Sequence, residues 1–243
     1  MRHLAALLAC LVIAGCATTE GNGRDPRDPW EGYNRGAFAF NDAFDKAIFK
    51  PVAKGYEKVV PAPGREGVNN FFNNLEDVGT SLNNLLQGKF KEGGSDAGRF
   101  VINTVFGIAG LWDIATPLGL EKHDEDFGQT LGWWGVQSGP YFVIPFLGPS
   151  TARDAPARLV SPEWYWPRLV PNDRLYWSLW TLDKVRQRAN LLPAESALEQ
   201  AALDRYTFVR DLWLQRRRSQ VYDGHPPPED EEEEPPKKDE GKK

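Results

Sequence analysis

Between Asp126 and Arg153 the chain contains no acidic or basic residue, and the run is rich in Trp, Phe and Ile. A helix of about 20 apolar residues would span the hydrocarbon core of a bilayer. Glycines and prolines interrupt this run at short intervals, and an irregular backbone facing lipid would leave its polar groups unpaired. We therefore predict an irregular or hairpin-like element here, with the β-favouring part at YFVI, residues 141–144.

The N-terminus has the layout of a secretory signal. Arg2 and His3 precede an apolar block that ends in IAGC at residues 13–16. We predict a lipoprotein signal peptide at residues 1–15, because these last four residues resemble a bacterial lipobox, in which Cys16 becomes the acylated first residue. An ordinary signal peptide with a chance cysteine is the alternative. Two or more acyl chains would make the anchoring stable.

Cysteine content and charge divide the rest of the chain. The only other cysteine, Cys10, lies within the signal, so no disulfide can form. We expect a lipidated N-terminus and tether at residues 16–27, a folded domain at 28–222 and a disordered acidic, proline-rich tail at 223–243. The tail carries the whole formal net charge of −5, so the folded domain is nearly neutral. A basic nucleic-acid-binding surface is therefore excluded.

The folded part has helical periodicity. A first helix after Asp28 has an apolar stripe and is predicted to end at Pro51, and Pro61 and Pro63 mark a connection. A second helix follows, with apolar residues at Val68, Phe71, Phe72, Leu75, Val78, Leu82, Leu85 and Leu86 opposed by Asn69, Asn70, Asn73, Asn74, Asn83 and Asn84. Surface helices usually carry Lys and Glu on such a face. The amide face is predicted either to line a wet cavity or headgroup layer, or to be an ordinary polar surface.

The later helices are short or strongly aromatic. FVINTVFGIAGLW at residues 100–112 predicts an apolar helix about 20 Å long, shorter than a bilayer core of about 30 Å. A brief helix is expected after Pro149, and Asn172 or Asp173 is predicted to cap the next one. A last helix is expected from near Pro193 to the arginines at 216–218. These arginines suit a solvated C-terminal end, with contact to lipid phosphates as the alternative.

Catalytic and metal-binding signals are weak. His123 is the one histidine in the predicted domain, and GGSDA at residues 93–97 lacks the last glycine of a nucleophile elbow. The acidic residues at 124–126 suit a polar loop or helix cap better than a cation site. We therefore expect no enzymatic activity, no catalytic residue, no metal and no cofactor other than covalent lipid.

A set of ordered motifs resembles one known family. DPWEGYNR at 28–35, KPVA at 50–53, NNL at 73–75, LQG at 86–88, RFVINT at 99–104, FGQTLG at 127–132, GPY at 139–141 and RDLWLQRR at 210–217 follow one another in this order. Together with the lipobox, they resemble the MlaA (VacJ) lipoprotein family. The resemblance extends over nearly the whole predicted domain.

The resemblance implies a mainly α, single-domain fold, a ring of short amphipathic helices lying in one membrane leaflet. It implies an outer-membrane lipoprotein, on the periplasmic side, that removes mislocalised phospholipids from the outer leaflet through an amphipathic channel. The implied partners are a porin trimer and a soluble periplasmic phospholipid carrier (MlaC-like). Ala17 after Cys16 lacks the Asp that favours inner-membrane retention, which also fits the outer membrane.

The polar and apolar faces of the first two predicted helices indicate candidate residues for the channel. A path for a phospholipid must keep the lipid's phosphate hydrated while the lipid's tails stay in apolar surroundings. Candidate channel or lipid-contacting residues are Phe40, Asn41, Phe44, Asn70, Asn73 and Asn74. The alternative function is that of a non-transporting structural or porin-associated assembly lipoprotein of the envelope, which would share the anchor and the aromatic residues.

Overall fold

Helices make up most of the chain in a computed structural model, which describes residues 25–159, 172–201 and 203–228. The elements are α2 (Glu31–Phe44), the π-helix η1 (Asp45–Phe49), α3 (Lys50–Val59), α4 (Ala62–Leu86), α5 (Phe90–Val105), the 3-10 helix η2 (Thr116–Leu118), α6 (Phe127–Trp133), β1 (Tyr141–Ile144), β2 (Gly148–Thr151), α7 (Asp154–Arg158), α8 (Asp173–Ala201) and α9 (Arg205–Val221). The expectation of a mainly helical single domain is confirmed.

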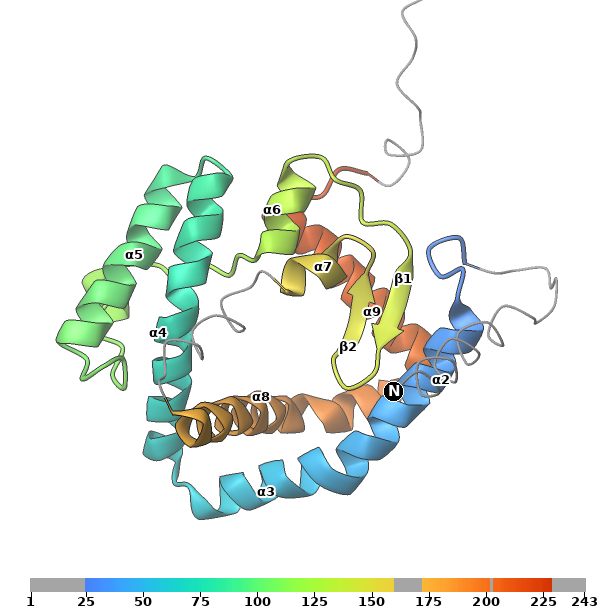
Figure 1. The fold of residues 1–243 in the computed structure, drawn as a ribbon, viewed down its shortest axis with the longest axis horizontal. Coiled ribbons are helices and arrows are strands. Elements are labelled where there is room, and N and C mark those ends of the chain that lie inside the picture. The colour runs from blue at the N-terminus through green and yellow to red at the C-terminus, as the bar shows by residue number, and fades with distance from the viewer. Residues whose placement is uncertain (1–24, 160–171, 202, 229–243) are drawn as a thin grey trace, which may run out of the picture.

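The elements follow one another around a ring (Figure 1). α4 forms one side, α8 and α3 form the next, and α2, α9 and the β1–β2 hairpin form the side opposite α4; α6 and α7 close the ring (Figure 1). α5 packs against α4 on the outside of the ring. Within the described residues, no helix combines the length and the apolar character needed to cross a bilayer.

Pro51 does not end the first helix, contrary to the sequence prediction. The five-residue π-helix η1 joins α2 to α3, and the Lys50 N–H donates to the Asp45 carbonyl across its wider turn. Pro51 then occupies the first turn of α3, where a residue without an N–H is tolerated. The widened turn moves the preceding carbonyls away from the proline ring, and the helix continues to Val59.

α4 and α5 form a close antiparallel pair through a small-residue contact. Gly88, with a φ of 79°, turns the chain after α4. At Gly93 a Cβ atom would lie 2.9 Å from the Leu85 side chain and 3.1 Å from the Ser81 carbonyl oxygen. The missing side chain therefore lets the two helices approach. The Ser81 hydroxyl takes advantage of this approach and donates to the Gly93 carbonyl (2.8 Å).

Gly93→Ala is expected to destabilise the protein by about 1–3 kcal/mol, because the added methyl group overpacks the α4–α5 contact. The matched control is Gly94→Ala, whose Cβ would meet nothing within 4 Å. That change should stabilise the protein by about 0.5–1 kcal/mol through helix propensity. Urea unfolding in mild detergent measures both. Equal stability of the two variants would contradict the close contact.

The apolar segment at residues 100–112 is helical only to Val105, so the prediction of a helix to Trp112 is wrong. Beyond Val105 the chain turns repeatedly, and Ile108, Ala109 and Gly110 all have positive φ. Asn103 stabilises this loop, because its side-chain oxygen accepts hydrogen bonds from the backbone of Ile114 (2.8 Å) and Ala115 (2.9 Å). Asn103 thus holds the loop that follows Val105 against the end of α5.

The uncharged run divides into a helix and a hairpin. Its first residues form α6, which begins because the Asp126 carboxylate accepts from the Gln129 N–H (2.9 Å). That short helix corrects the expectation that no part of the run is helical. The rest is confirmed as a hairpin: β1 pairs with β2 antiparallel, with Tyr141 opposite Thr151 and Ile144 opposite Gly148.

The C-terminal helices differ from the expected division. Asn172 caps α8 as predicted, since its side-chain oxygen accepts from the Arg174 N–H (2.9 Å). Pro193 lies inside α8 and does not begin the last helix. α9 instead begins after Asp204, whose carboxylate accepts from the Tyr206 N–H. The brief helix expected after Pro149 is confirmed as α7. The proline- and aromatic-rich sequence at residues 160–171, which the sequence predicts to be a connector, lies outside the described residues.

A small apolar core joins the hairpin to two helices. Its buried members are Ala37 of α2, Tyr141 and Val143 of β1, and Tyr206 of α9, with Phe38, Trp213 and Leu214 packed against them. Tyr141 and Val143 are completely buried, and they alternate with less buried residues along β1 as a half-buried strand requires.

Candidate functional site

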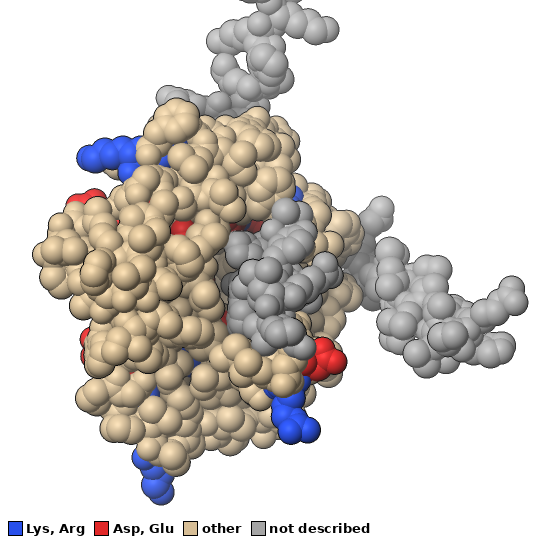
Figure 2. Space-filling view, turned by 60° about the vertical axis from the view of Figure 1, so that its left-hand side comes forward, with Lys and Arg blue, Asp and Glu red and all other residues tan. Residues whose placement is uncertain are grey.

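Large apolar side chains are exposed over much of the described surface. They are concentrated on α4, α5 and the loop that follows α5: Val78, Leu82, Leu85, Leu86, Phe90, Val101, Val105, Phe106, Ile108, Leu111 and Trp112. Figure 2 brings this side of the ring forward and shows a broad face on which charged residues lie mainly near the edges. Soluble monomers rarely expose an apolar patch of this extent, so the face suits contact with lipid or with an apolar protein surface.

The interior is polar, in contrast to the apolar outer face. Among the described residues, buried polar and charged side chains outnumber buried apolar ones, whereas Asn, Asp and Arg are mostly exposed in ordinary soluble proteins. In α4, Asn74, Asn83 and Asn84 are all at most 5% exposed. The amide face of α4 is therefore not an ordinary solvated surface. In the C-terminal half of the helix the apolar residues Val78, Leu82, Leu85 and Leu86 face out, whereas Phe72 is buried.

The buried amides of α4 bind groups on neighbouring elements. Asn84 donates to Asp96 of α5 (2.9 Å), and Asn83 accepts from the Thr130 hydroxyl of α6 (2.9 Å). Each buried amide must find such a partner, because an unpaired one costs about 1–3 kcal/mol. α4 is thus held in the ring by polar contacts, and its leucines stay free for the outer surface.

The three predicted α4 candidates point towards different neighbours. Asn70 donates to the Leu111 carbonyl (3.3 Å), and Asn74 donates to the Thr104 hydroxyl (2.9 Å). Asn73 accepts from Arg186 of α8 (3.1 Å). All three side chains contact neighbouring groups of the protein, although the buried Asn74 Oδ1 has no hydrogen-bond partner among the described residues. The structure does not gather the three amides into one set of lipid-binding groups.

The three candidates on α2 cluster around the tip of the hairpin. The Asn41 amide donates to the Ile144 carbonyl (3.0 Å) and accepts from the Phe146 N–H (2.7 Å). Phe40 and Phe44 each pack edge-on against Phe146, with ring centroids 5.0 Å apart. Asn41 thus braces the hairpin. α2 and α4 lie on different sides of the ring, so the six predicted residues form two separate groups (Figure 1).

A second asparagine, which the sequence analysis did not select, holds the other end of the hairpin. Asn34 is completely buried. It donates to Asp28 (2.6 Å) and to the Tyr141 carbonyl (3.2 Å), and it accepts from the Val143 N–H (2.8 Å). Asp28 also accepts from the hydroxyl of Tyr206. The seven-residue spacing of Asn34 and Asn41 places both amides on one face of α2, a signal that was available in the sequence.

Arg217 is the centre of a buried ion-pair cluster, and the expectation of a solvated basic end is wrong for it. Its guanidinium forms two 2.6 Å hydrogen bonds to Asp126 and bonds of 2.9 and 3.1 Å to Asp154. A Cβ on Gly128 would clash with this guanidinium, so that glycine makes room for it. One side chain therefore ties α9 to α6 and α7. Arg216, by contrast, is exposed.

The two carboxylates of this cluster titrate below their usual range. Burial alone would raise the pKa of Asp154, but hydrogen bonds from Arg217 and Arg153 outweigh it and lower that pKa. The pKa of Asp126 is lowered for the same reason, with Arg217 as the main opposing partner. Asp126 also caps α6, which confirms the preference for a helix cap at residues 124–126. The described residues contain no group of side chains able to hold a metal ion.

Lowered carboxylate pKa values predict a loss of stability in acid. The stabilisation from Asp126 and Asp154 is fully present above the unfolded pKa of about 3.9 and is lost as the pH falls through their lower folded values. We expect the urea midpoint of the wild type to fall between pH 5 and pH 3 more steeply than that of Arg217→Met, which lacks the partner. Parallel pH profiles for the two proteins would contradict this assignment.

Comparison with known proteins agrees with this architecture. The family model described as MlaA lipoprotein matches residues 26–220. The intermembrane phospholipid transport system lipoprotein MlaA of Escherichia coli is 35% identical over 224 residues, covering 89% of this chain and 87% of the relative. The Haemophilus influenzae protein of the same description is 32% identical and covers 91% of this chain and 90% of the relative.

A solved structure is also similar. It comes from work described as the structural basis for maintenance of bacterial outer membrane lipid asymmetry. It matches with a TM-score of 0.69 and 32% sequence identity, over 82% of this chain and 100% of that one. From the family model, the relatives and this fold, the chain belongs to the MlaA lipoprotein family.

Proposed function

We propose that this protein takes part in intermembrane phospholipid transport and removes mislocalised phospholipids from the outer leaflet of the outer membrane. The observation that carries the proposal is the reversed distribution of side chains: leucines, valines and aromatic residues face outward, and amides and charges face inward. Relatives of similar length are described as phospholipid transport lipoproteins, which supports the same function.

The reversed distribution suits a protein seated in one leaflet. Outward apolar side chains on α4 and α5 would lie among acyl chains, where they cost nothing to expose. A polar interior would let the phospholipid phosphate stay hydrated, which matters because a charged group is costly to strip of water. A lipid could then move with its headgroup on the polar side and its tails on the apolar side.

The cellular setting belongs to the same proposal. Acylation of Cys16 would anchor the chain at the periplasmic side of the outer membrane, and the short tether would keep the ring at that surface. A porin trimer and a periplasmic phospholipid carrier are the proposed partners. The lipobox and the match to a lipoprotein family support the anchor.

Deletion and complementation test the proposal. We expect deletion to raise the amount of phospholipid that an added phospholipase can reach at the cell surface, and the wild-type gene to restore the low level. Cys16→Ser should fail to restore it. Porin trimer assembly, measured in the same cells, addresses the alternative function. Normal surface lipid with defective porin assembly would replace transport by the assembly role.

A further inference from the structure

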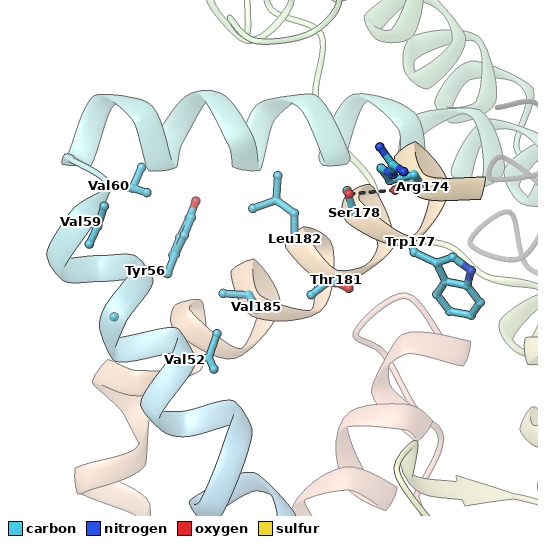
Figure 3. Close-up of a pocket in the computed structure, with 11 residues that line it drawn as sticks. Val52, Tyr56, Val59, Val60, Arg174, Trp177, Ser178, Thr181, Leu182 and Val185 are labelled. Carbon is cyan, nitrogen blue, oxygen red and sulfur yellow. Dashed lines mark hydrogen bonds between the residues drawn. The ribbon is translucent and has the colours of Figure 1, made fainter. Parts of the chain in front are cut away.

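An open apolar groove of about 840 Å³ lies between α3 and α8, apart from the buried polar contacts of α4. Its walls include Val52, Tyr56 and Val59 from α3 and Trp177, Leu182 and Val185 from α8. In Figure 3 the side chains of Tyr56, Leu182 and Val185 project into the space between the two helices. The volume falls within the range of about 300–1,000 Å³ typical of small-molecule sites.

The groove is long enough for a single hydrocarbon chain. Its α3 wall extends from Val52 to Val60, and its α8 wall extends from Arg174 to Val185. At 1.5 Å per residue these walls are about 12 and 16 Å long. An extended chain of about ten methylenes matches that length, at about 1.3 Å per carbon from C–C bonds of about 1.5 Å. Valine and leucine side chains supply most of the apolar surface that such a chain would contact.

A cation marks one end of the groove. Arg174 lines it in the first turn of α8, is exposed, and forms no ion pair with any described residue. The arginines further along α8 differ: Arg186 pairs with Asp183 (2.6 Å) and Arg188 pairs with Asp45 (2.7 Å). The N-terminal end of a helix also favours negative charge. The hydroxyls of Ser178 and Thr181 lie along the same wall.

We propose that this groove binds one acyl chain of a phospholipid whose phosphate lies beside Arg174. An apolar groove with the unpaired cation of Arg174 at its end is complementary to an anionic amphiphile. An apolar peptide would not require a positive charge at that position. The inference rests on the proposed function, because it names a place where the transported lipid is held. It adds a binding site on the α3–α8 side of the ring.

Photo-crosslinking tests the site directly. The full-length lipidated protein is placed in vesicles of phosphatidylethanolamine and phosphatidylglycerol that contain a phosphatidylglycerol probe with a diazirine in one acyl chain. After irradiation, mass spectrometry locates the modified peptides. We expect crosslinks within residues 52–60 and 174–185. Absence of label from both segments would overturn the proposal.

Gly55 and Gly36 provide a matched pair of variants. Both are helical glycines, and a Cβ on either would meet nothing within 4 Å, but only Gly55 lines the groove. Gly55→Leu should fill part of the groove, displace about two methylenes of lipid and reduce groove labelling about tenfold. Gly36→Leu should leave labelling unchanged. Both changes raise helix propensity, so both variants should fold. Equal labelling of the two variants would overturn the groove assignment.

Charge reversal separates headgroup recognition from simple apolar binding. Arg174→Glu should reduce labelling by the phosphatidylglycerol probe about three- to tenfold, and Lys91→Glu on α5 should not. A diacylglycerol probe with the same diazirine should label both variants equally, because it lacks the phosphate. If Arg174→Glu reduces labelling by neither probe, or reduces labelling by both probes equally, the proposed contact between Arg174 and the phosphate is wrong.

The surface phospholipid assay keeps this inference separate from the proposed function. A wild-type protein that restores lipid asymmetry but shows no groove labelling would contradict the groove alone. A protein with labelled peptides that fails to restore asymmetry would contradict the transport function and leave a lipid-binding groove. A third outcome would assign the groove to an apolar protein partner instead of lipid. In that case the partner would abolish labelling, and the probes with and without a phosphate would label the groove equally.

Discussion

Arg217→Met is expected to lower the free energy of unfolding by up to about 3–5 kcal/mol, because it removes the arginine partner of Asp126 and leaves the buried Asp154 carboxylate with Arg153 alone. The Arg217 guanidinium binds Asp126 and Asp154, and Asp154 is only 3% exposed. The loss should separate α9 from α6 and α7. Urea unfolding at pH 7 in mild detergent measures the change.

Arg216→Met is the control, because this neighbouring side chain is 72% exposed and lies 3.9 Å from its nearest carboxylate. An exposed ion pair contributes about 0–1 kcal/mol. Combining Arg217→Met with Asp126→Asn and Asp154→Asn should recover part of the lost stability, since the buried Asp154 charge and the half-exposed Asp126 charge are then removed together with their partner. If Arg217→Met and Arg216→Met have equal stability, Arg217 does not hold these elements together.

Asn34→Ala is expected to detach β1 from α2 at a cost of about 2–4 kcal/mol. The change removes the partner of the Val143 N–H and of the Tyr141 carbonyl, and each unpaired buried group costs about 1–3 kcal/mol. It also removes a hydrogen bond to the buried Asp28 carboxylate. Urea unfolding gives the loss of stability, and amide hydrogen exchange at Val143 shows whether the hairpin has opened.

Asn190→Ala serves as the comparison, because this exposed amide bonds only to the Asn69 side chain. Its effect should be within about 0.5 kcal/mol of the wild type. Preserved protection of the Val143 amide in Asn34→Ala would mean that the hairpin is held by the apolar core alone.

The secondary structure was largely predictable from the sequence, because periodicity and capping are local. The stripe from Val68 to Leu86 predicts α4, and the uncharged, glycine-rich run predicts the hairpin at residues 141–151. Pro51 and Pro193 misled the division into helices. Pro51 is tolerated in the first turn of α3, directly after the π-helix η1, and the sequence does not show which turn will widen. Pro193 lies inside α8, where no local signal in the sequence predicted a continuing helix.

Periodicity also did not show which side of each helix faces inward. The apolar stripe of α4 was the natural candidate for a core, yet Leu82 is 56% exposed while Asn84 is 1% exposed. An amphipathic pattern is the same whether the apolar side meets protein or lipid. The absence of charge from the amide face was the one local signal, since a solvated face would carry Lys and Glu.

The candidate residues were chosen by type, and their partners could not be read from the sequence. Asn41, Asn70, Asn73 and Asn74 are uncharged polar residues on helices that also carry an apolar face, as the prediction required. Their hydrogen bonds go to loops and helices far away in the chain, such as Phe146 for Asn41. Only the three-dimensional arrangement distinguishes an amide that braces a hairpin from one that meets a ligand.

Spin-label accessibility tests most directly whether the apolar side of the ring lies in lipid. Both cysteines precede the described residues, and in the proposed mature lipoprotein, which lacks Cys10 and carries lipid on Cys16, a single new cysteine gives a clean label. Labels at Leu82, Val101 and Val105 should collide more with oxygen than with a water-soluble nickel chelate in membranes. Labels at Asp124 and Arg216, whose side chains are 77% and 72% exposed, should do the reverse. Preferential collision with the nickel chelate at all five positions would contradict a lipid-facing exterior.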